Sequence, residues 1–182
     1  MENLEYKAEL RDPTLARLVI QQGRSLYVGT FDQVDTYFHV ADGRLKRRQC
    51  EGEPVEWIHY HRPNELEPRI SRFSIYSEEE ARTRFGQSQL AVRAVVRKRR
   101  QLWLHRAVRI HMDEVEGLGR FIELEAMVTP THDHDACRES LAQLMLQLAP
   151  AMGEPISDSY CDLIEREGQE QVGQGQERDH SG

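Results

Sequence analysis

"GRFIELEAMV", residues 119–128, alternates apolar and acidic side chains. Ile122 and Leu124 fall on one face of an extended chain, and Glu123 and Glu125 fall on the other. On its own this pattern is typical of a half-buried strand whose acidic face meets water. Whether the acidic face instead points into an interior depends on the rest of the chain.

Similar alternating segments lie upstream, and Gly, Pro and Asn residues separate them. In residues 4–11 (LEYKAELR), for example, Leu4 and Tyr6 alternate with Glu5 and Lys7. Short strands with turn residues at this spacing are typical of antiparallel hairpins. We expect about eight strands, at residues 4–11, 33–40, 44–52, 54–63, 69–77, 90–105, 107–119 and 120–128.

Helices are expected outside these strands. Asp12 is a suitable N-cap with Pro13 in the first turn, and Ser77 followed by Glu80 resembles a capping box. The expected helices are residues 12–23, 77–87, 133–150 and 157–168. Together the segments predict an α+β fold, a closed or nearly closed eight-stranded antiparallel β-barrel with flanking helices.

Length and composition are those of one soluble domain. The chain has 182 residues with 38% apolar content, which is enough for a real core. No apolar run approaches 18 residues and no signal peptide is visible, so we expect a cytoplasmic protein without a membrane partner. Its three cysteines indicate reduced thiols. We expect the domain at residues 1–168 and a disordered polar tail at residues 169–182.

Charge is distributed unevenly along the chain. The net charge of −7 argues against a specific nucleic-acid partner. Residues 39–110 nevertheless hold 16 Lys and Arg against 9 Asp and Glu, which gives +7 there and −14 elsewhere. A basic segment inside an acidic protein suggests an anionic ligand held internally, although a surface patch would give the same count.

The charged faces of the strands favour an interior site. Arg44, Lys46 and Arg48 alternate on one strand, and Lys98 and Arg100 on another. If such faces lined the barrel, the helices would cover its apolar outer faces and the lumen would be a polar tunnel. Converging Arg and Lys side chains pair with phosphate oxygens. Neighbouring carboxylates repel one another without a cation, and Mg²⁺ or Mn²⁺ takes both carboxylate and phosphate oxygens.

The ordered series LEYK, GRLKRR, YHRP, VRKRR, HMDEV, GLGRFIELE and SYCDL resembles a known family. It is similar to the CYTH domain, named for class IV adenylyl cyclases and mammalian thiamine triphosphatase, among the triphosphate tunnel metalloenzymes. The resemblance spans about residues 3–165 and implies an eight-stranded tunnel. It implies a metal-dependent enzyme whose substrate is ATP, thiamine triphosphate or tripolyphosphate. A homodimer is compatible with the sequence.

The resemblance also assigns roles to residues, which we expect to share one cavity. Asn3 stands where the family's first motif glutamate is expected, so one carboxylate is missing from the metal end. Asp113 would be a further acidic member of the site. The metal ligands implied are Glu5, Glu123 and Glu125; the substrate-binding residues are Arg44, Lys46, Arg62, Lys98 and Arg100; the catalytic residues are Lys7, Lys98, Arg100 and Asp113.

Three functions stay open at this point. A cyclase would form cyclic AMP and pyrophosphate from ATP. The motifs resemble class IV cyclase-like proteins slightly more than thiamine triphosphatase, which slightly favours this class. A hydrolase would cleave tripolyphosphate, thiamine triphosphate or a nucleotide, and a non-catalytic phosphate-binding module would do neither. Weaker alternatives are a metal site at residues 131–135 (THDHD), which are better read as a helix cap, and a nucleic-acid strip at residues 95–105. His105 and His111 are expected as strand residues near the tunnel mouth rather than as zinc ligands.

Overall fold

The computed structural model describes residues 1–86 and 90–168, and the expected polar tail lies outside them. The strands are β1 (Glu2–Leu10), β2 (Leu26–Phe38), β3 (Arg44–Cys50), β4 (Glu56–His61), β5 (Arg69–Tyr76), β6 (Val92–His105), β7 (Val108–Val115), β8 (Gly119–Met127) and β9 (Met152–Pro155). The helices are α1 (Pro13–Gln22), α2 (Glu78–Phe85), α3 (His134–Leu148) and the short 3-10 helix η1 (Ala149–Ala151). Residues 160–168 are also helical.

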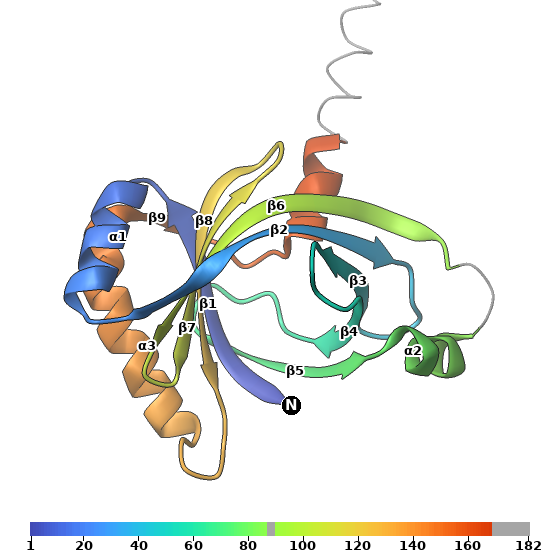
Figure 1. Ribbon diagram of the computed structural model, residues 1–182, viewed down its shortest axis with the longest axis horizontal. Helices are drawn as coiled ribbons and strands as arrows, with labels where there is room; N and C mark the ends of the chain where they lie inside the picture. Colours follow the sequence, from blue (N-terminus) through green and yellow to red (C-terminus); the bar gives the residue numbers. More distant parts are fainter. Residues whose placement is uncertain (87–89, 169–182) are drawn as a thin grey trace, which may run out of the picture.

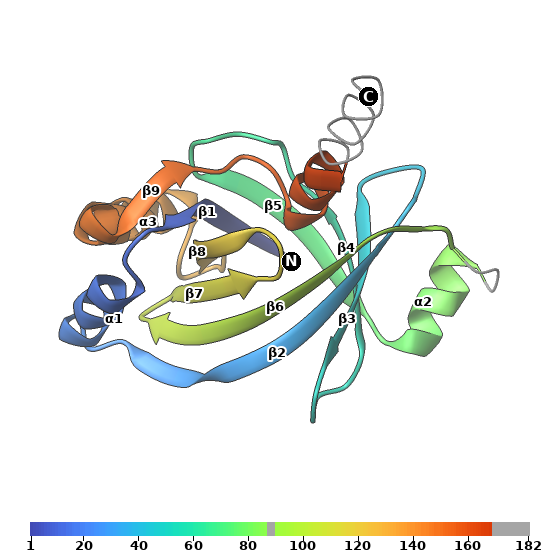
Figure 2. The same cartoon turned by 90° about the horizontal axis from the view of Figure 1, so that it is seen from above.

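Eight of these strands close into an antiparallel barrel, as the sequence predicts. They follow one another in the order β5-β4-β3-β2-β6-β7-β8-β1, and a pairing between β1 and β5 closes the ring. The ninth strand, β9, pairs with Ala8 and Leu10 at the C-terminal end of β1, beyond residues 2–5 that pair with β5. Helices α1 and α3 lie at one end of the molecule and α2 at the other when it is seen from above (Figure 2).

Local sequence explains where the helices begin. The side chain of Asp12 accepts hydrogen bonds from the backbone N–H groups of the first turn of α1, at 2.9 and 3.0 Å. Ser77 and Glu80 form the expected capping box of α2. Asp133 accepts from the backbone of Ala136 at 3.0 Å and so caps α3. The THDHD stretch therefore contributes a helix cap, as expected.

Two apolar clusters hold the barrel. The larger cluster lies outside the sheet, where α1 and α3 cover strands β1, β7 and β8 (Figure 1). Buried residues of this cluster include Ile110, Ile122 and Leu124. The smaller cluster lies inside one end of the barrel, where Tyr160 and Cys161 pack on inward-facing residues of several strands. The apolar face of the β8 stretch thus points outward under helices, which leaves its acidic face to point inward.

Two segments differ from the sequence expectation. Strand β2 begins at Leu26, not at Gln33, and its pairing with β6 shifts register between Tyr27 and Gly29. A glycine at such an irregularity interrupts the alternation of side chains, so periodicity does not predict the strand there. A Cβ at Gly29 would lie 3.1 Å from the ring of Phe31, so the ring lies close over this backbone. Strand β9 was not expected, because four residues are too few to show a period. Among the described residues, no helix is long and apolar enough to cross a membrane.

Candidate active site

Strand register brings the acidic face of β8 against charged residues of its two neighbours. Glu123 is opposite Lys7 of β1 on one side and His111 of β7 on the other. Two residues along, Glu125 is opposite Glu5 and Arg109 in the same way. Directly opposed residues share one face of a sheet. The alternation that opens the sequence analysis therefore places three carboxylates on the inner wall of the barrel.

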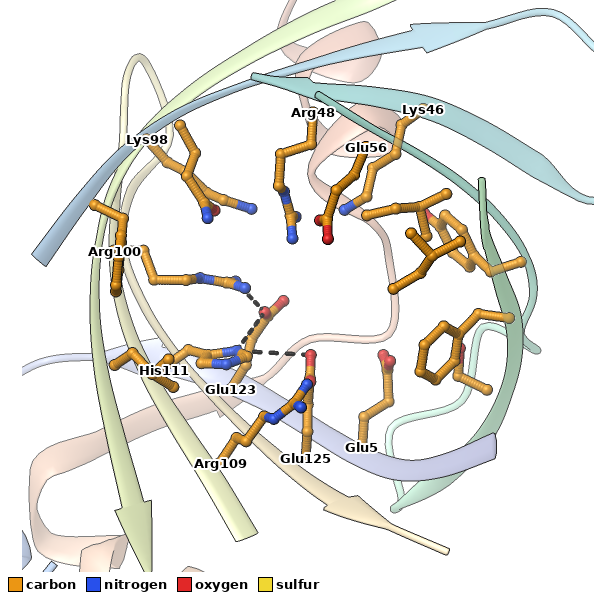
Figure 3. Close-up of a pocket in the computed structure, with 18 of the residues that line it drawn as sticks. Glu5, Lys46, Arg48, Glu56, Lys98, Arg100, Arg109, His111, Glu123 and Glu125 are labelled. Atoms are coloured by element: carbon orange, nitrogen blue, oxygen red, sulfur yellow. Dashed lines mark hydrogen bonds and ion pairs between the residues drawn. The ribbon is translucent and has the colours of Figure 1, made fainter. Parts of the chain in front are cut away.

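These side chains line a cavity of about 620 Å³ inside the barrel. The basic residues gather mainly on one side of it, and the three glutamates Glu5, Glu123 and Glu125 lie together on the other (Figure 3). The charged residues that line the cavity are Glu5, Lys7, Lys46, Arg48, Glu53, Glu56, Arg62, Lys98, Arg100, Arg109, Glu123 and Glu125, together with His111.

The acidic side of the cavity is a candidate metal site. Ligand atoms of His111, Glu123 and Glu125 all lie within 4.8 Å of one another. Nδ1 of His111 makes no hydrogen bond although it is buried, and it lies 3.7 Å from Glu123 and 3.6 Å from Glu125. The amide oxygen of Asn3 is also buried in the cavity wall without a partner. Several oxygens and one unpartnered nitrogen that converge in this way suit a divalent cation.

Arg100 is held rigidly beside this acidic side. Its guanidinium forms a two-pronged pair with Asp113, at 2.7 and 2.5 Å, and reaches Glu123 at 2.5 Å. Burial alone would lower the pKa of Arg100, but Asp113 and Glu123 raise it well above its usual value. The Tyr160 hydroxyl donates to Asp113 at 2.8 Å. Arg100 is therefore a permanently charged group, and its two hydrogen bonds to Asp113 fix the orientation of its guanidinium.

A second cationic group surrounds Asp35, which is fully buried. Arg48 binds it with two hydrogen bonds of 2.8 and 2.9 Å, and Lys46 and Lys98 each lie 3.1 Å from the same carboxylate. Burial would raise the pKa of Asp35, but these three cations hold it well below its usual value. One carboxylate thus serves three cations, so the group keeps an excess of positive charge.

The pKa values of the lysines in the chamber are lowered, chiefly by burial. Burial, followed by repulsion from Arg48, lowers the pKa of Lys46 to about 7. Burial also lowers the pKa of Lys98, and repulsion from Arg100 adds to this effect. Burial lowers the pKa of Lys7 to about 8, although Glu123 lies 3.2 Å away. Cations in this state gain stability from any anion that enters the cavity.

Residues 156–168 close one end of the barrel next to these groups. Lys7 donates to the backbone carbonyl of Asp158 at 3.0 Å, and Arg62 donates to that of Ser157 at 3.2 Å. The ring of Tyr160 lies under Lys7, with 4.0 Å from Nζ to the ring centroid. Arg62 also forms an ion pair with Glu5. The cavity is accordingly a chamber with a wall built by the C-terminal segment.

Most of the predicted site residues share this chamber, and two do not line it. Arg44 instead pairs with Asp162 at 3.1 Å and with Asn64 at 2.9 Å, because the C-terminal segment packs over it. Asp113 lies behind Arg100 and is occupied by Arg100 and Tyr160. Arg44, which was expected to face the cavity with the other basic residues, is therefore not among the residues that line it. The residues that do line it are Glu5, Lys7, Lys46, Arg62, Lys98, Arg100, Glu123 and Glu125.

Sequence reasoning did not assign roles to several residues of the chamber. Periodicity placed Arg48 on the same charged strand face as Arg44 and Lys46, but the family resemblance gave it no role. His111 was expected as a strand residue rather than as a metal ligand, yet it lies on the inner face of β7, two residues before Asp113, and its ring nitrogen adjoins Glu123 and Glu125. Asp35 carried no signal, because a single Asp in a strand looks like any solvated residue. The remaining unassigned residues of this kind are Arg109 and Tyr160.

Comparison with known proteins agrees with this architecture. Residues 1–160 match the sequence profile of the CYTH domain. A protein of Methanocaldococcus jannaschii named "Putative adenylate cyclase" is 24% identical over 137 residues, which are 73% of this chain and 77% of that protein. A solved Pyrococcus horikoshii structure covers 90% of this chain and 99% of its own, with TM-score 0.71 and 17% identity. A Hippeastrum structure, described as a "Putative adenylyl cyclase" with "a dominant" triphosphatase activity, covers 92% and 96%, with TM-score 0.61 and 16% identity.

Proposed function

The chain belongs to the CYTH domain family, and from that premise we propose that it is a metal-dependent enzyme that cleaves a triphosphate inside its barrel. The observation that carries this proposal is the surplus of buried cations around Asp35. Lys46, Arg48 and Lys98 share that one carboxylate, and burial followed by repulsion from Arg48 lowers the pKa of Lys46 to about 7. A polyphosphate supplies several negative charges along one short chain, so it matches a row of cations better than a single phosphate does.

The donor set on the opposite side fits a divalent metal. Glu5, Glu123, Glu125 and His111 would hold it, and the unpartnered amide oxygen of Asn3 is a further oxygen nearby. Mg²⁺ suits the carboxylates, and Mn²⁺ accepts the imidazole nitrogen more readily. When bound, such an ion would neutralise charge that develops on phosphate oxygens.

The remaining residues bind and orient the phosphates. Arg100 presents a guanidinium that Asp113 prevents from rotating, so it can bind oxygen atoms without a loss of side-chain freedom. Lys98 and Lys46 approach from the neighbouring wall as point charges. Residues 157–160 form the wall of the chamber that Lys7 and Arg62 contact. Phosphoryl transfer needs little beyond this positioning and electrostatic stabilisation.

Two reactions are compatible with this arrangement. In the first, the ribose 3′-oxygen of ATP bonds to the α-phosphorus, the bond from that phosphorus to the bridging oxygen breaks, pyrophosphate leaves, and the hydroxyl proton passes to solvent. The M. jannaschii relative's name supports this cyclase candidate. In the second, a water oxygen bonds to the terminal phosphorus, the bond from that phosphorus to its bridging oxygen breaks, orthophosphate and the diphosphate product are released, and the water proton passes to solvent. The Hippeastrum protein's described activity supports this hydrolase candidate equally.

A panel of triphosphates tests the proposal. The protein is incubated with ATP, thiamine triphosphate or tripolyphosphate, with Mg²⁺, Mn²⁺ or a chelator, and the products are separated by chromatography. Cyclic AMP with pyrophosphate assigns the cyclase reaction, whereas orthophosphate with a diphosphate product assigns hydrolysis. Absence of any metal-dependent product from all three substrates would leave only a phosphate-binding module and refute the proposal.

A further inference from the structure

Another cavity, of about 590 Å³, lies outside the chamber. It is lined mainly by the segment between β4 and β5, by the start of β5 and by one residue of α3, and we call it the outer pocket. Within the described part of the chain, four of its lining residues are arginines and a single one, Glu65, is acidic. The arginines are Arg62, Arg69, Arg72 and Arg138. Arg62 is the only one of the four that also lines the chamber.

Arg69 is the most deeply buried of these arginines, and its side chain is 0% exposed. Its Nη1 donates to the backbone carbonyl of Ile156 at 3.1 Å and also to that of Glu65. Its Nη2 is buried as well, but among the described residues it has no hydrogen-bond partner. A buried donor that lacks an acceptor is unfavourable, so Arg69 would be stabilised by an oxyanion that enters the outer pocket.

One carboxylate serves the two buried arginines. Glu5 forms an ion pair with Arg62, and it lies 3.5 Å from Nε of Arg69, its direct neighbour in the register of β1 and β5. Burial, followed by repulsion from Arg62, lowers the pKa of Arg69. Two guanidiniums thus share one negative charge, and the base of the outer pocket has an excess of positive charge.

The two other arginines lie at the solvent-exposed rim of the outer pocket. Arg72 pairs with Glu2 at 2.7 Å, and Arg138 pairs with Asp135 at 3.0 Å. The side chains of Arg72 and Arg138 are nevertheless 71% and 58% exposed. Ion pairs that are this exposed contribute little free energy, so both guanidiniums can turn toward an anion at small cost.

We propose that the outer pocket is a second anion site, which binds inorganic phosphate as orthophosphate or pyrophosphate, with Arg62 and Arg69 at its base and Arg72 and Arg138 at its rim. A phosphate group carries more charge than a carboxylate and presents oxygen atoms in several directions. It therefore suits guanidiniums that approach from different elements, which a planar carboxylate would not satisfy together. Both anions are products of the reactions proposed above, but the site does not depend on that function.

Calorimetric titration of the full chain with orthophosphate, and separately with pyrophosphate, tests this inference in a chelator that removes divalent metal. Arg138→Gln removes a rim charge at an exposed helix position far from the chamber lining. The matched control is Arg82→Gln. Arg82 is 68% exposed on α2, also pairs with a carboxylate of its own helix, Glu78 at 3.7 Å, and lines neither the chamber nor the outer pocket.

We expect the wild type to bind at least one of the two anions at two sites, the chamber and the outer pocket. Arg138→Gln should weaken one site about 3- to 10-fold and leave the other unchanged, whereas Arg82→Gln should change neither. Arg69→Lys keeps a positive charge beside Glu5 but has no Nη2, so it should weaken the same site about 10-fold or more.

The two variants support each other, because Arg138 is exposed and its replacement should not disturb folding even if that of Arg69 does. A wild type that binds both anions at a single site, or at none, would overturn the inference. The same conclusion would follow if Arg138→Gln bound both anions as Arg82→Gln does.

Discussion

Replacing Asp35 with asparagine removes the one carboxylate that Arg48, Lys46 and Lys98 share. The carboxylate is fully buried, and four contacts of 2.8 to 3.1 Å from three cations converge on it. Removing one partner of a buried ion pair costs about 3–5 kcal/mol, because the other charge stays desolvated. For a domain of this size, that loss lowers the melting temperature by about 6–20 °C.

The assay is urea or thermal unfolding of Asp35→Asn beside Asp32→Asn, an exposed position on the same strand. The control should unfold like the wild type. Because its folded pKa lies well below its unfolded value of about 3.9, Asp35 stabilises the fold above about pH 4. That contribution is lost as the pH falls through the folded pKa, so the two variants should converge in acid.

Tripolyphosphate adds a second readout. A ligand at a concentration of about one hundred times its Kd stabilises the folded protein by about 2.7 kcal/mol. The chamber of Asp35→Asn has lost a negative charge, so the anion should bind it more tightly and raise its melting temperature more than that of the wild type. An Asp35→Asn protein as stable as Asp32→Asn at pH 7, with no extra gain from tripolyphosphate, would refute the charge-surplus argument.

Three further predictions concern the two sides of the chamber. Lys46, whose pKa is about 7, faces Asp35, Arg48, Lys98 and Arg100, and a bound polyphosphate should raise this pKa. Calorimetry should therefore show proton uptake on polyphosphate binding, and the affinity for polyphosphate should fall as the pH rises above 7. Glu125→Gln should weaken Mn²⁺ binding at least tenfold with little change in melting temperature, since among the described residues the Glu125 carboxylate pairs only with the His111 ring, at 3.6 Å; unchanged metal affinity would contradict its role. Arg100→Lys should lower kcat/KM for any triphosphate substrate at least tenfold, because lysine cannot keep the two-pronged pair with Asp113, and wild-type kinetics would show that the fixed guanidinium is unnecessary.

The barrel could be predicted because apolar and charged side chains alternate regularly along most of its strands. Alternation fixed which face of β8 carries Glu123 and Glu125, and the caps at Asp12 and Ser77 gave two helix starts correctly. Short or irregular elements were beyond this reasoning. Gly29 interrupts the first half of β2, and the four residues of β9 are held by pairing to β1 rather than by a pattern of their own.

The site was predictable only where charges repeat along a strand. Lys98 and Arg100, or Glu123 and Glu125, mark an inner face by their spacing. Asp35 has no such repeat, and its role comes from three cations that only the closed barrel brings together.

The position of Arg44 depends on a tertiary contact that no strand pattern contains. By period it faces inward, yet Asp162 from the C-terminal segment draws its guanidinium away from the cavity. The same segment supplies Tyr160, which lies far along the chain from Lys7 and Asp113 but contacts both. Sequence could place the walls of the chamber, but not the segment that closes it.

The central claim is that one chamber holds a metal on its acidic side and a triphosphate on its basic side. Anomalous diffraction from a crystal grown with Mn²⁺ and tripolyphosphate tests it most directly. The account predicts a manganese peak among His111, Glu123 and Glu125, with phosphate density that reaches Lys46, Lys98 and Arg100. Manganese and phosphate bound only on the outer surface of the barrel, with the chamber filled by water alone, would contradict it.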